Sequence, residues 1–181
     1  MSAPRAPDAI TTERLVLRRP RASDAGAIFA RYSSDPDVTR LVGWPRHRSV
    51  DDARGFLQFT DAEWKRAPAG TYLIESRETG VLLGSTGLLF EAPYRAMTGY
   101  VLAKDAWGRG YATEALRAMV DTARLLSVRR LYALCHHEHR ASAHVLEKCG
   151  FSLEGCLRAY AEFPNLRAGV PQDVACYAIL L

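Results

Sequence analysis

Hydrophobic residues change their spacing several times along the chain, and each change predicts a new element. Near the N-terminus, Leu15 and Leu17 alternate with polar residues, which predicts a strand that Pro20 ends. The stretch 21–34 carries apolar residues on one helical face, and a short helical piece is expected after Pro36. The N-terminal part of the chain therefore reads as one strand followed by helical segments.

A longer helix is predicted over 49–67, where apolar residues recur at three- and four-residue spacing. Ser49 and Asp52 fit a capping box at its start, with Asp where Glu or Gln is usual. The pattern then changes to short apolar runs separated by polar turns, which predicts antiparallel strands joined by hairpins. These three predicted strands cover 71–76, 81–90 and 97–103.

The C-terminal part alternates helical and strand patterns. A helix is predicted after Gly110, and a second over 140–151, closed by Gly150 as its C-terminal cap. Strands are predicted over 129–137, 151–160 and 173–181. With no internal repeat and no linker, this order predicts a single α+β domain over 11–181 after a flexible N-terminal segment, 1–10.

Composition and charge exclude several classes of protein. The 181 residues are 48% hydrophobic and 24% charged with a net charge of +4, and no run of five like charges indicates nucleic-acid binding. A mild positive excess would still attract a small polyanion. The first ten residues lack the apolar core of a signal peptide, and no run reaches membrane-spanning length. We therefore expect a cytoplasmic protein that contacts no membrane.

The four cysteines do not predict a metal site. They are Cys135, Cys149, Cys156 and Cys176, and none forms a CxxC pair. Cys135 lies near three histidines, but without zinc-ligand spacing. We expect these cysteines to be small buried hydrophobic residues in a reducing compartment, with no bound metal.

The stretch "WGRGYATEAL", residues 107–116, places Gly108 and Gly110 at the start of a helix. Glycine lets the backbone come close to a ligand, and a helix N-terminus with free N–H groups attracts anions. The triphosphate-loop signature GxxxxGK[ST] is absent, and Thr113 occupies the third glycine position of a dinucleotide loop. Two interpretations remain from these residues alone: a pyrophosphate loop of an acyl-CoA binding fold, or a tight turn with two glycines.

Several motifs in order resemble the GNAT acetyltransferases, in the branch of the ribosomal-protein N-terminal acetyltransferases RimJ and RimL. These motifs are "TERLVLR" at 12–18, "GYVLAKDAWGRGYATEAL" at 99–116 and "RASAHVLEKCGFSLEG" at 140–155, together with "GW" at 43–44 and "LRAY" at 157–160. The resemblance implies a mixed, mostly antiparallel sheet of about seven strands, flanked by about four helices. It also implies that the fourth and fifth strands splay apart.

The resemblance implies that acetyl-CoA lies in this splay, with its pantetheine arm along the fourth strand and its pyrophosphate on the glycine loop. The residues it assigns to the cofactor are Tyr100, Val101, Leu102, Ala106, Trp107, Gly108, Arg109, Gly110, Tyr111, Ala112, His139 and Ser142. Arg109 either adds charge to this site or is a solvated loop arginine. A strand N–H near Tyr100 would stabilise the oxyanion.

Four positions depart from the family pattern. Trp107 stands where Gln or Arg is usual, and His139 where many members have an Asn that contacts the cofactor. Histidine can donate one hydrogen bond in either tautomer. His139 therefore either keeps the contact with the cofactor or is a loop residue with no role in binding it. Leu146 stands where other branches have a Tyr general acid. In the RimL-like branch a Ser takes this role toward the leaving thiolate, and Ser142 matches it, with a hydrogen bond to its own helix as the alternative.

The fourth departure concerns the general base. Many relatives have Glu at the start of the fourth strand, where this chain has Met97. Glu91, near the end of the preceding strand, is a candidate substitute, directly or through water, or an ordinary hairpin charge. A free α-amine has a pKa near 8, so keeping it neutral at pH 7 costs about 1.4 kcal/mol, against about 4.6 kcal/mol for a lysine amine. An enzyme without a strong base therefore favours an α-amine.

The resulting prediction is an acetyl-CoA-dependent N-acetyltransferase that acts on a primary amine, on a protein N-terminus or an amino-acid-like small molecule. The alternatives are a polyamine or aminoglycoside acetyltransferase, and a CoA-binding module that has lost catalysis. Candidate walls of the acceptor site are Trp44, Tyr94, Tyr160 and Phe163, each of which also fits ordinary packing. Many relatives are dimers, so a homodimer stays open.

Overall fold

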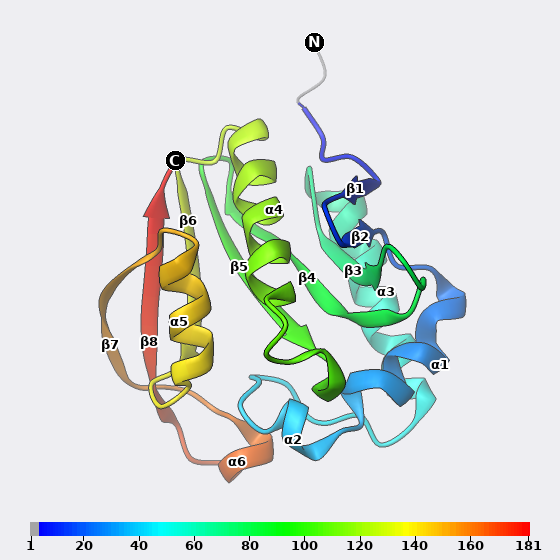
Figure 1. Cartoon of the computed structure of the whole chain (residues 1–181). Helices are drawn as coiled ribbons and strands as arrows, with labels where there is room; N and C mark the ends of the chain where they lie inside the picture. Colours follow the sequence, from blue (N-terminus) through cyan, green and yellow to red (C-terminus); the bar gives the residue numbers. More distant parts are fainter. Residues whose placement is uncertain (1–3) are drawn as a thin grey trace.

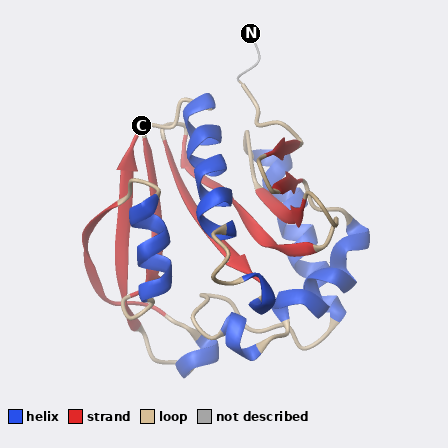
Figure 2. Cartoon of the chain, viewed as in Figure 1, coloured by secondary structure: helices blue, strands red, loops and turns tan. Residues whose placement is uncertain are grey.

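A computed structural model describes residues 4–181 and shows one open eight-stranded sheet with helices on both faces (Figures 1 and 2). The strand order is β1-β2-β3-β4-β5-β6-β8-β7. The strands are β1 (Ala9–Thr11), β2 (Leu15–Arg18), β3 (Thr71–Ser76), β4 (Leu82–Ala92), β5 (Arg95–Leu102), β6 (Arg130–His136), β7 (Ser152–Ala161) and β8 (Gln172–Leu180). The helices are α1 (Ala25–Ile28), α2 (Pro36–Thr39), α3 (Val50–Arg66), α4 (Tyr111–Leu125), α5 (Arg140–Lys148) and α6 (Pro164–Arg167). This confirms the predicted single mixed α/β domain.

The N-terminal helices cover the face of the sheet behind α4 in Figure 1. Ile28 of α1 and Leu57 of α3 pack with Leu73 of β3 and Leu82 of β4 in one buried cluster. The predicted capping box at the start of α3 is present, since Ser49 and Asp52 each bind the other's backbone amide. Helix α1 continues as a π-helical turn over Phe29–Ser33.

The predicted meander is also present, as β3, β4 and β5 pair antiparallel in sequence. Helix α4 packs on the opposite face of this sheet with an almost entirely apolar side. The residues of α4 that are fully buried there are Ala115, Leu116, Met119 and Ala123. This packing fixes the N-terminal end of α4 next to the end of β5, because the connection is short.

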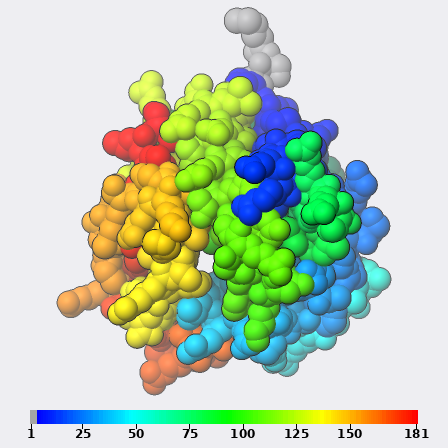
Figure 3. All heavy atoms as spheres, viewed as in Figure 1, coloured from blue at the N-terminus to red at the C-terminus, as the bar shows by residue number. Residues whose placement is uncertain are grey.

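The strands β5 and β6 are parallel and pair only at their beginnings. Arg95, Ala96 and Met97 face Arg130, Leu131 and Tyr132, and no later residues of the two strands pair. Beyond Met97 the strands therefore separate, which confirms the predicted splay between the fourth and fifth predicted strands. In Figure 3 the surface is hollowed between the yellow atoms of α5 and the green atoms of the loop before α4.

The structure differs from the sequence prediction at the N-terminus. Ala9 and Ile10 belong to the segment expected to be flexible, yet with Thr11 they form β1, which pairs with β2. Ala6 is buried and its amide donates to Pro68 O at 2.8 Å. Because the three residues of β1 are too few to show a periodic pattern, about seven strands were predicted where the sheet has eight. The segment 1–3 of this prediction lies outside the described residues.

The described residues hold six helices, where about four were predicted. Helix α2 is the short helical piece expected after Pro36, whereas α6 was not predicted, because a single turn of four residues is too short for a hydrophobic stripe to show. Each begins with a proline at its first turn, which is the usual local signal. No helix within residues 4–181 is long and apolar enough to span a bilayer.

Candidate active site

The loop between β5 and α4 presents main-chain amides to the solvent. A 3-10 turn, Lys104–Ala106, leads into Gly108 and Gly110, which have φ angles of +71° and +79°. Only glycine adopts such angles without strain. The first amide that donates within α4 is that of Glu114, to Gly110 O at 3.1 Å. Among the described residues, the amides of 108–113 donate to no backbone carbonyl.

These free amides lie at the positive end of a 15-residue helix that has no side-chain cap. A helix N-terminus with unpaired N–H groups is a site for a phosphate or other anion. Trp107, at the unusual position of the loop, donates from Nε1 to Leu102 O at 2.9 Å. The indole thus ties the loop to the end of β5, which a Gln or Arg need not do.

The second half of β5 has a partner on only one side. Tyr100, Val101 and Leu102 face Thr86, Ser85 and Gly84 of β4, while β6 has already separated. An added Cβ at Gly84 would lie 2.0 Å from Val101 O, so glycine is required for the close approach of the two strands there. The open edge of β5 is suited to an extended ligand that forms backbone hydrogen bonds, as an added strand would.

Tyr100 and Ser142 meet at the mouth of the splay. The Tyr100 hydroxyl lies 3.0 Å from Ser142 Oγ and donates to Ser142 O, also at 3.0 Å. Burial raises the pKa of Tyr100, so the phenol stays neutral. Burial also raises the pKa of the Cys135 thiol, against an opposing hydrogen bond from Ser142. The Ser142 hydroxyl is thus bound to another side chain, not to its own helix, and Leu146 lies buried one turn further on.

Two side chains, those of Tyr132 and Arg95, bind the Glu91 carboxylate. This carboxylate accepts a hydrogen bond from the Tyr132 hydroxyl and forms an ion pair with Arg95 at 2.8 Å. Tyr132 faces Met97 directly in the β5–β6 register, at the last pair before the splay. Burial, and then the bond to Glu91, raise the pKa of Tyr132. Sequence reasoning missed Tyr132, although an aromatic hydroxyl on the half-buried face of a core strand was a signal.

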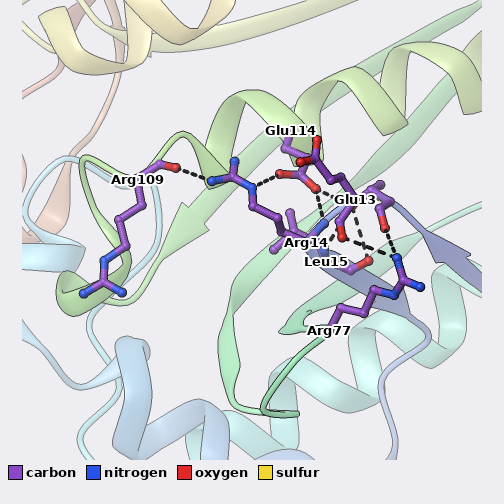
Figure 4. Close-up of polar contacts among 7 residues, drawn as sticks. Glu13, Arg14, Leu15, Arg77, Arg109 and Glu114 are labelled. Atoms are coloured by element: carbon purple, nitrogen blue, oxygen red, sulfur yellow. Dashed lines mark hydrogen bonds and ion pairs between the residues drawn. The ribbon is translucent and has the colours of Figure 1, made fainter.

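His139 and Arg109 lie on either side of the splay without polar side-chain contacts. His139 precedes α5, and burial, with a smaller effect of His136, lowers its pKa, so the imidazole is neutral at pH 7. Its amide, not its ring, makes the local hydrogen bond, to His136 O at 2.8 Å. The Arg109 carbonyl accepts from Arg14 at 2.9 Å, whereas its guanidinium points away from this contact (Figure 4).

The four candidate acceptor residues do not form one wall. Trp44 lies in a loop that Asn165 binds, since Asn165 Nδ2 donates to Trp44 O at 2.8 Å and to Thr39 O at 2.7 Å. Phe163, just before α6, is buried and packs edge-on against His136 at the end of β6, with ring centroids 4.8 Å apart. These residues lie at one end of β6.

The structure does not bring Tyr94 to them. Tyr94 lies in the hairpin before β5, and its carbonyl accepts from Arg129 and Arg130 at the start of β6. Tyr160 is 57% exposed and follows Ala159, a non-glycine residue with a φ of +45° inside a bulge of β7. Such a bulge redirects a side chain, which accounts for the exposure of Tyr160.

A groove of about 860 Å³ runs along α4 on the side of the N-terminal strands. Thr12, Arg14, Glu114 and Arg117 line it, and of the residues assigned to the splay only Gly110 and Thr113, at the end of the glycine loop, reach it. We therefore place the chemistry in the splay and not in this groove. Within residues 4–181, no three His, Cys, Asp or Glu side chains come together as metal ligands.

Comparison with known proteins agrees with this geometry. The family model of the acetyltransferase (GNAT) domain matches residues 14–152. The chain is 33% identical to the uncharacterized N-acetyltransferase YoaA of Bacillus subtilis, over 94% of this chain and 96% of the relative. It is 27% identical to a ribosomal-protein-serine acetyltransferase of Escherichia coli, over 80% and 79% of the two chains.

Among solved structures, RimL, a ribosomal L7/L12 alpha-N-protein acetyltransferase in complex with coenzyme A, superposes with a TM-score of 0.82. It is 25% identical, over 96% of this chain and 98% of that one. The chain therefore belongs to the GNAT acetyltransferases. It is an acetyl-CoA-dependent N-acetyltransferase whose neighbours include the RimL branch, as the sequence motifs predicted.

Proposed function

We propose that the enzyme acetylates an α-amine, on a protein N-terminus or an amino-acid-like small molecule, by direct attack on the thioester. The observation that carries this proposal is the absence of a free carboxylate at the start of β5. Met97 occupies that position, and the candidate substitute, Glu91, is bound by Tyr132 and Arg95. An α-amine needs less help to become neutral than a lysine amine does. Two relatives, a ribosomal-protein-serine acetyltransferase and a ribosomal alpha-N-protein acetyltransferase, support the same class.

The residues of this chain fit acetyl-CoA, which supplies an activated acetyl group when bound. The unpaired amides of 108–113 at the start of α4 suit the pyrophosphate. The open edge of β5, at Tyr100, Val101 and Leu102, suits the pantetheine arm, and a strand N–H near Tyr100 suits the oxyanion.

Ser142 is proposed to give its proton to the leaving thiolate. It holds that proton at the mouth of the splay, where the Tyr100 hydroxyl lies 3.0 Å from its Oγ. The two hydroxyls can exchange donor and acceptor roles, so Tyr100 keeps Ser142 oriented. His139, neutral and half-buried beside this helix start, can contribute one donor to the cofactor arm.

Release of coenzyme A thiol with a panel of amines tests the proposal. The panel holds α-amine peptides varied at residue one, free amino acids, polyamines, aminoglycosides and a lysine peptide blocked at its N-terminus. Turnover is expected on α-amines, with kcat/KM rising about tenfold per pH unit up to the pKa of the amine, near pH 8. Robust lysine-peptide acetylation without α-amine activity would overturn the α-amine proposal, and a preference for polyamines or aminoglycosides would replace its acceptor class.

Ser142→Ala tests the thiolate role in the same assay. We expect kcat to fall by about 100-fold with little change in KM for acetyl-CoA, because general acid catalysis contributes at least that much. Ser152→Ala, at the exposed start of β7, is the matched control and should keep full activity. An unchanged kcat in Ser142→Ala would remove Ser142 from the mechanism.

A further inference from the structure

A polar network connects the N-terminal strand region to the first turn of α4 (Figure 4). Glu114 accepts hydrogen bonds from Thr12 Oγ1 at 2.6 Å, from the Arg14 amide at 2.8 Å and from Arg14 Nε at 2.7 Å. The Arg14 guanidinium also donates from Nη1 to Arg109 O at 2.9 Å and lies 4.8 Å above the centroid of the Tyr111 ring. Arg14 therefore contacts both the glycine loop and the helix that follows it.

The carboxylate in this network is nearly buried and fully engaged. The Glu114 side chain is 15% exposed. Burial raises its pKa, but the hydrogen bonds from Thr12 and Arg14 outweigh this effect, so the pKa lies below its usual value. Glu114 is thus an anion in the first turn of α4, directly after the free amides of 108–113. The guanidinium of Arg14 compensates that charge, which would otherwise repel a second anion.

The contact with Arg109 O fixes the direction of one amide. A trans peptide is planar, so its C=O and N–H point in opposite directions. When Arg14 holds the Arg109 carbonyl on the side of β2, the N–H of Gly110 must point to the other side. That side is free of backbone partners, since the amides of 108–113 donate to no described backbone carbonyl. The network orients the loop before any ligand binds.

We propose that Arg14 is a positioning residue for acetyl-CoA, acting on the pyrophosphate through the orientation of the Arg109–Gly110 peptide. The inference rests on the proposed assignment of this loop to the pyrophosphate. It accounts for two of the sequence motifs together, because Thr12 and Arg14 of "TERLVLR" bind Glu114 and Arg109 of "WGRGYATEAL". Arg14 does not touch the reacting atoms, so its effect must depend on whether the donor carries phosphates.

The test compares acetyl-CoA with S-acetylpantetheine, which lacks the phosphates and the adenosine, as acetyl donors for wild type and Arg14→Gln. The variant should lose about tenfold or more in kcat/KM for acetyl-CoA, because charge-assisted hydrogen bonds are lost. Its kcat/KM for S-acetylpantetheine should stay within twofold of wild type. A variant that fails to fold would lose both activities, so the second donor reports on the integrity of the site.

Arg77→Gln is the matched control. Its guanidinium lies within 3.5 Å of the carbonyls of Thr12 and Glu13 in the same region but makes no contact with the loop (Figure 4). Removing it changes the net charge equally, so any long-range attraction of a polyanion falls by the same amount in both variants. Arg77→Gln should keep the wild-type preference for acetyl-CoA. Arg14→Lys separates charge from geometry, since a lysine cannot bind Glu114 and Arg109 O with a fixed fork.

The outcomes separate two failures. If wild type uses both donors equally well, the loop does not bind the pyrophosphate, and the proposed site assignment itself is wrong. If wild type prefers acetyl-CoA and Arg14→Gln keeps that preference, the site stands but the positioning role is overturned. Full recovery in Arg14→Lys would show that the charge acts and the peptide orientation does not, which also contradicts the proposal.

Discussion

The donor side of the splay is built from consecutive main-chain groups, whereas the proposed acceptor side is built from side chains of separate elements. On the donor side, the amides of 108–113 and the edge of β5 follow each other in sequence. On the acceptor side, Trp44 comes from a loop held by Asn165, Phe163 from the residue before α6, and Tyr160 from a bulge of β7. A backbone site leaves a motif in the sequence, because glycine and helix-start residues are required there. A site built from side chains of separate elements leaves no such motif, because its residues are distant from one another in the sequence.

The largest expected effect is on the donor side, at Gly110. Gly110→Val forces a β-branched residue to a φ of +79°, and the strain should change the loop and lower kcat/KM for acetyl-CoA by roughly 10- to 100-fold. Isothermal calorimetry of coenzyme A binding measures the loss directly. Gly26→Ala, in α1 with open space around the added Cβ, is the control and should bind normally. Normal binding by Gly110→Val would mean that the loop is only a turn.

A smaller effect is expected at Tyr100, where donor side and chemistry meet. Tyr100→Phe keeps the ring but removes the hydroxyl that orients Ser142, so kcat should fall about tenfold while KM for acetyl-CoA stays unchanged. Steady-state kinetics with the best amine of the panel measures both constants. Tyr177→Phe, a buried tyrosine of β8 whose hydroxyl contacts Glu147, is the control. A raised KM with unchanged kcat would make Tyr100 a binding residue instead.

The pair formed by Glu91, the candidate base, and Tyr132 should respond more weakly still. Glu91→Gln and Tyr132→Phe should each lower kcat/KM for an α-amine only a few-fold, and the double variant no further, because the two side chains act as one unit. The kinetics of the three variants with the same peptide form the measurement. A loss of more than 100-fold in Glu91→Gln, with a shifted pH profile, would identify Glu91 as the missing base and contradict the interpretation of Met97.

The smallest expected effect concerns the pH dependence of stability. Burial lowers the pKa of His136 and of His139, so the unfolded chain binds protons near pH 6.5 and the folded chain only at lower pH. Stability should therefore fall as the pH drops below about 6.5. His139→Asn should reduce the difference in Tm between pH 7.5 and pH 5.5 by on the order of 2 °C. An identical difference in the variant would show that His139 is exposed to protons when folded.

The sequence predicted most of the fold, because its long elements carry clear periodicity. The meander, α3, α4 and the short helical piece after Pro36 were expected from the residue pattern, and the splay was implied by the family resemblance. By contrast, β1 and α6 have three and four residues and no pattern to read. In the candidate site, the glycine loop was recognised from the sequence, because Gly108 and Gly110 stand at the start of a predicted helix. Arg14, Glu114 and Tyr132 were not recognised, since their roles depend on partners that are distant in the sequence. The partners of Arg14 and Glu114 lie 95 to 102 residues away, and Glu91, the partner of Tyr132, lies 41 residues away.

The brief pairing of β5 with β6 also has a mechanical consequence. Only three residue pairs connect the two halves of the sheet, so this junction is the natural place for local opening. A ligand that lies between β5 and β6 and forms hydrogen bonds with both strands would connect the two halves of the sheet. Within 98–102, the amides that face the open edge and not β4 should then exchange fast in the free enzyme and slow markedly with coenzyme A, while the far end of α4 stays unaffected. The enzyme would thus become a single rigid sheet only while its cosubstrate is bound.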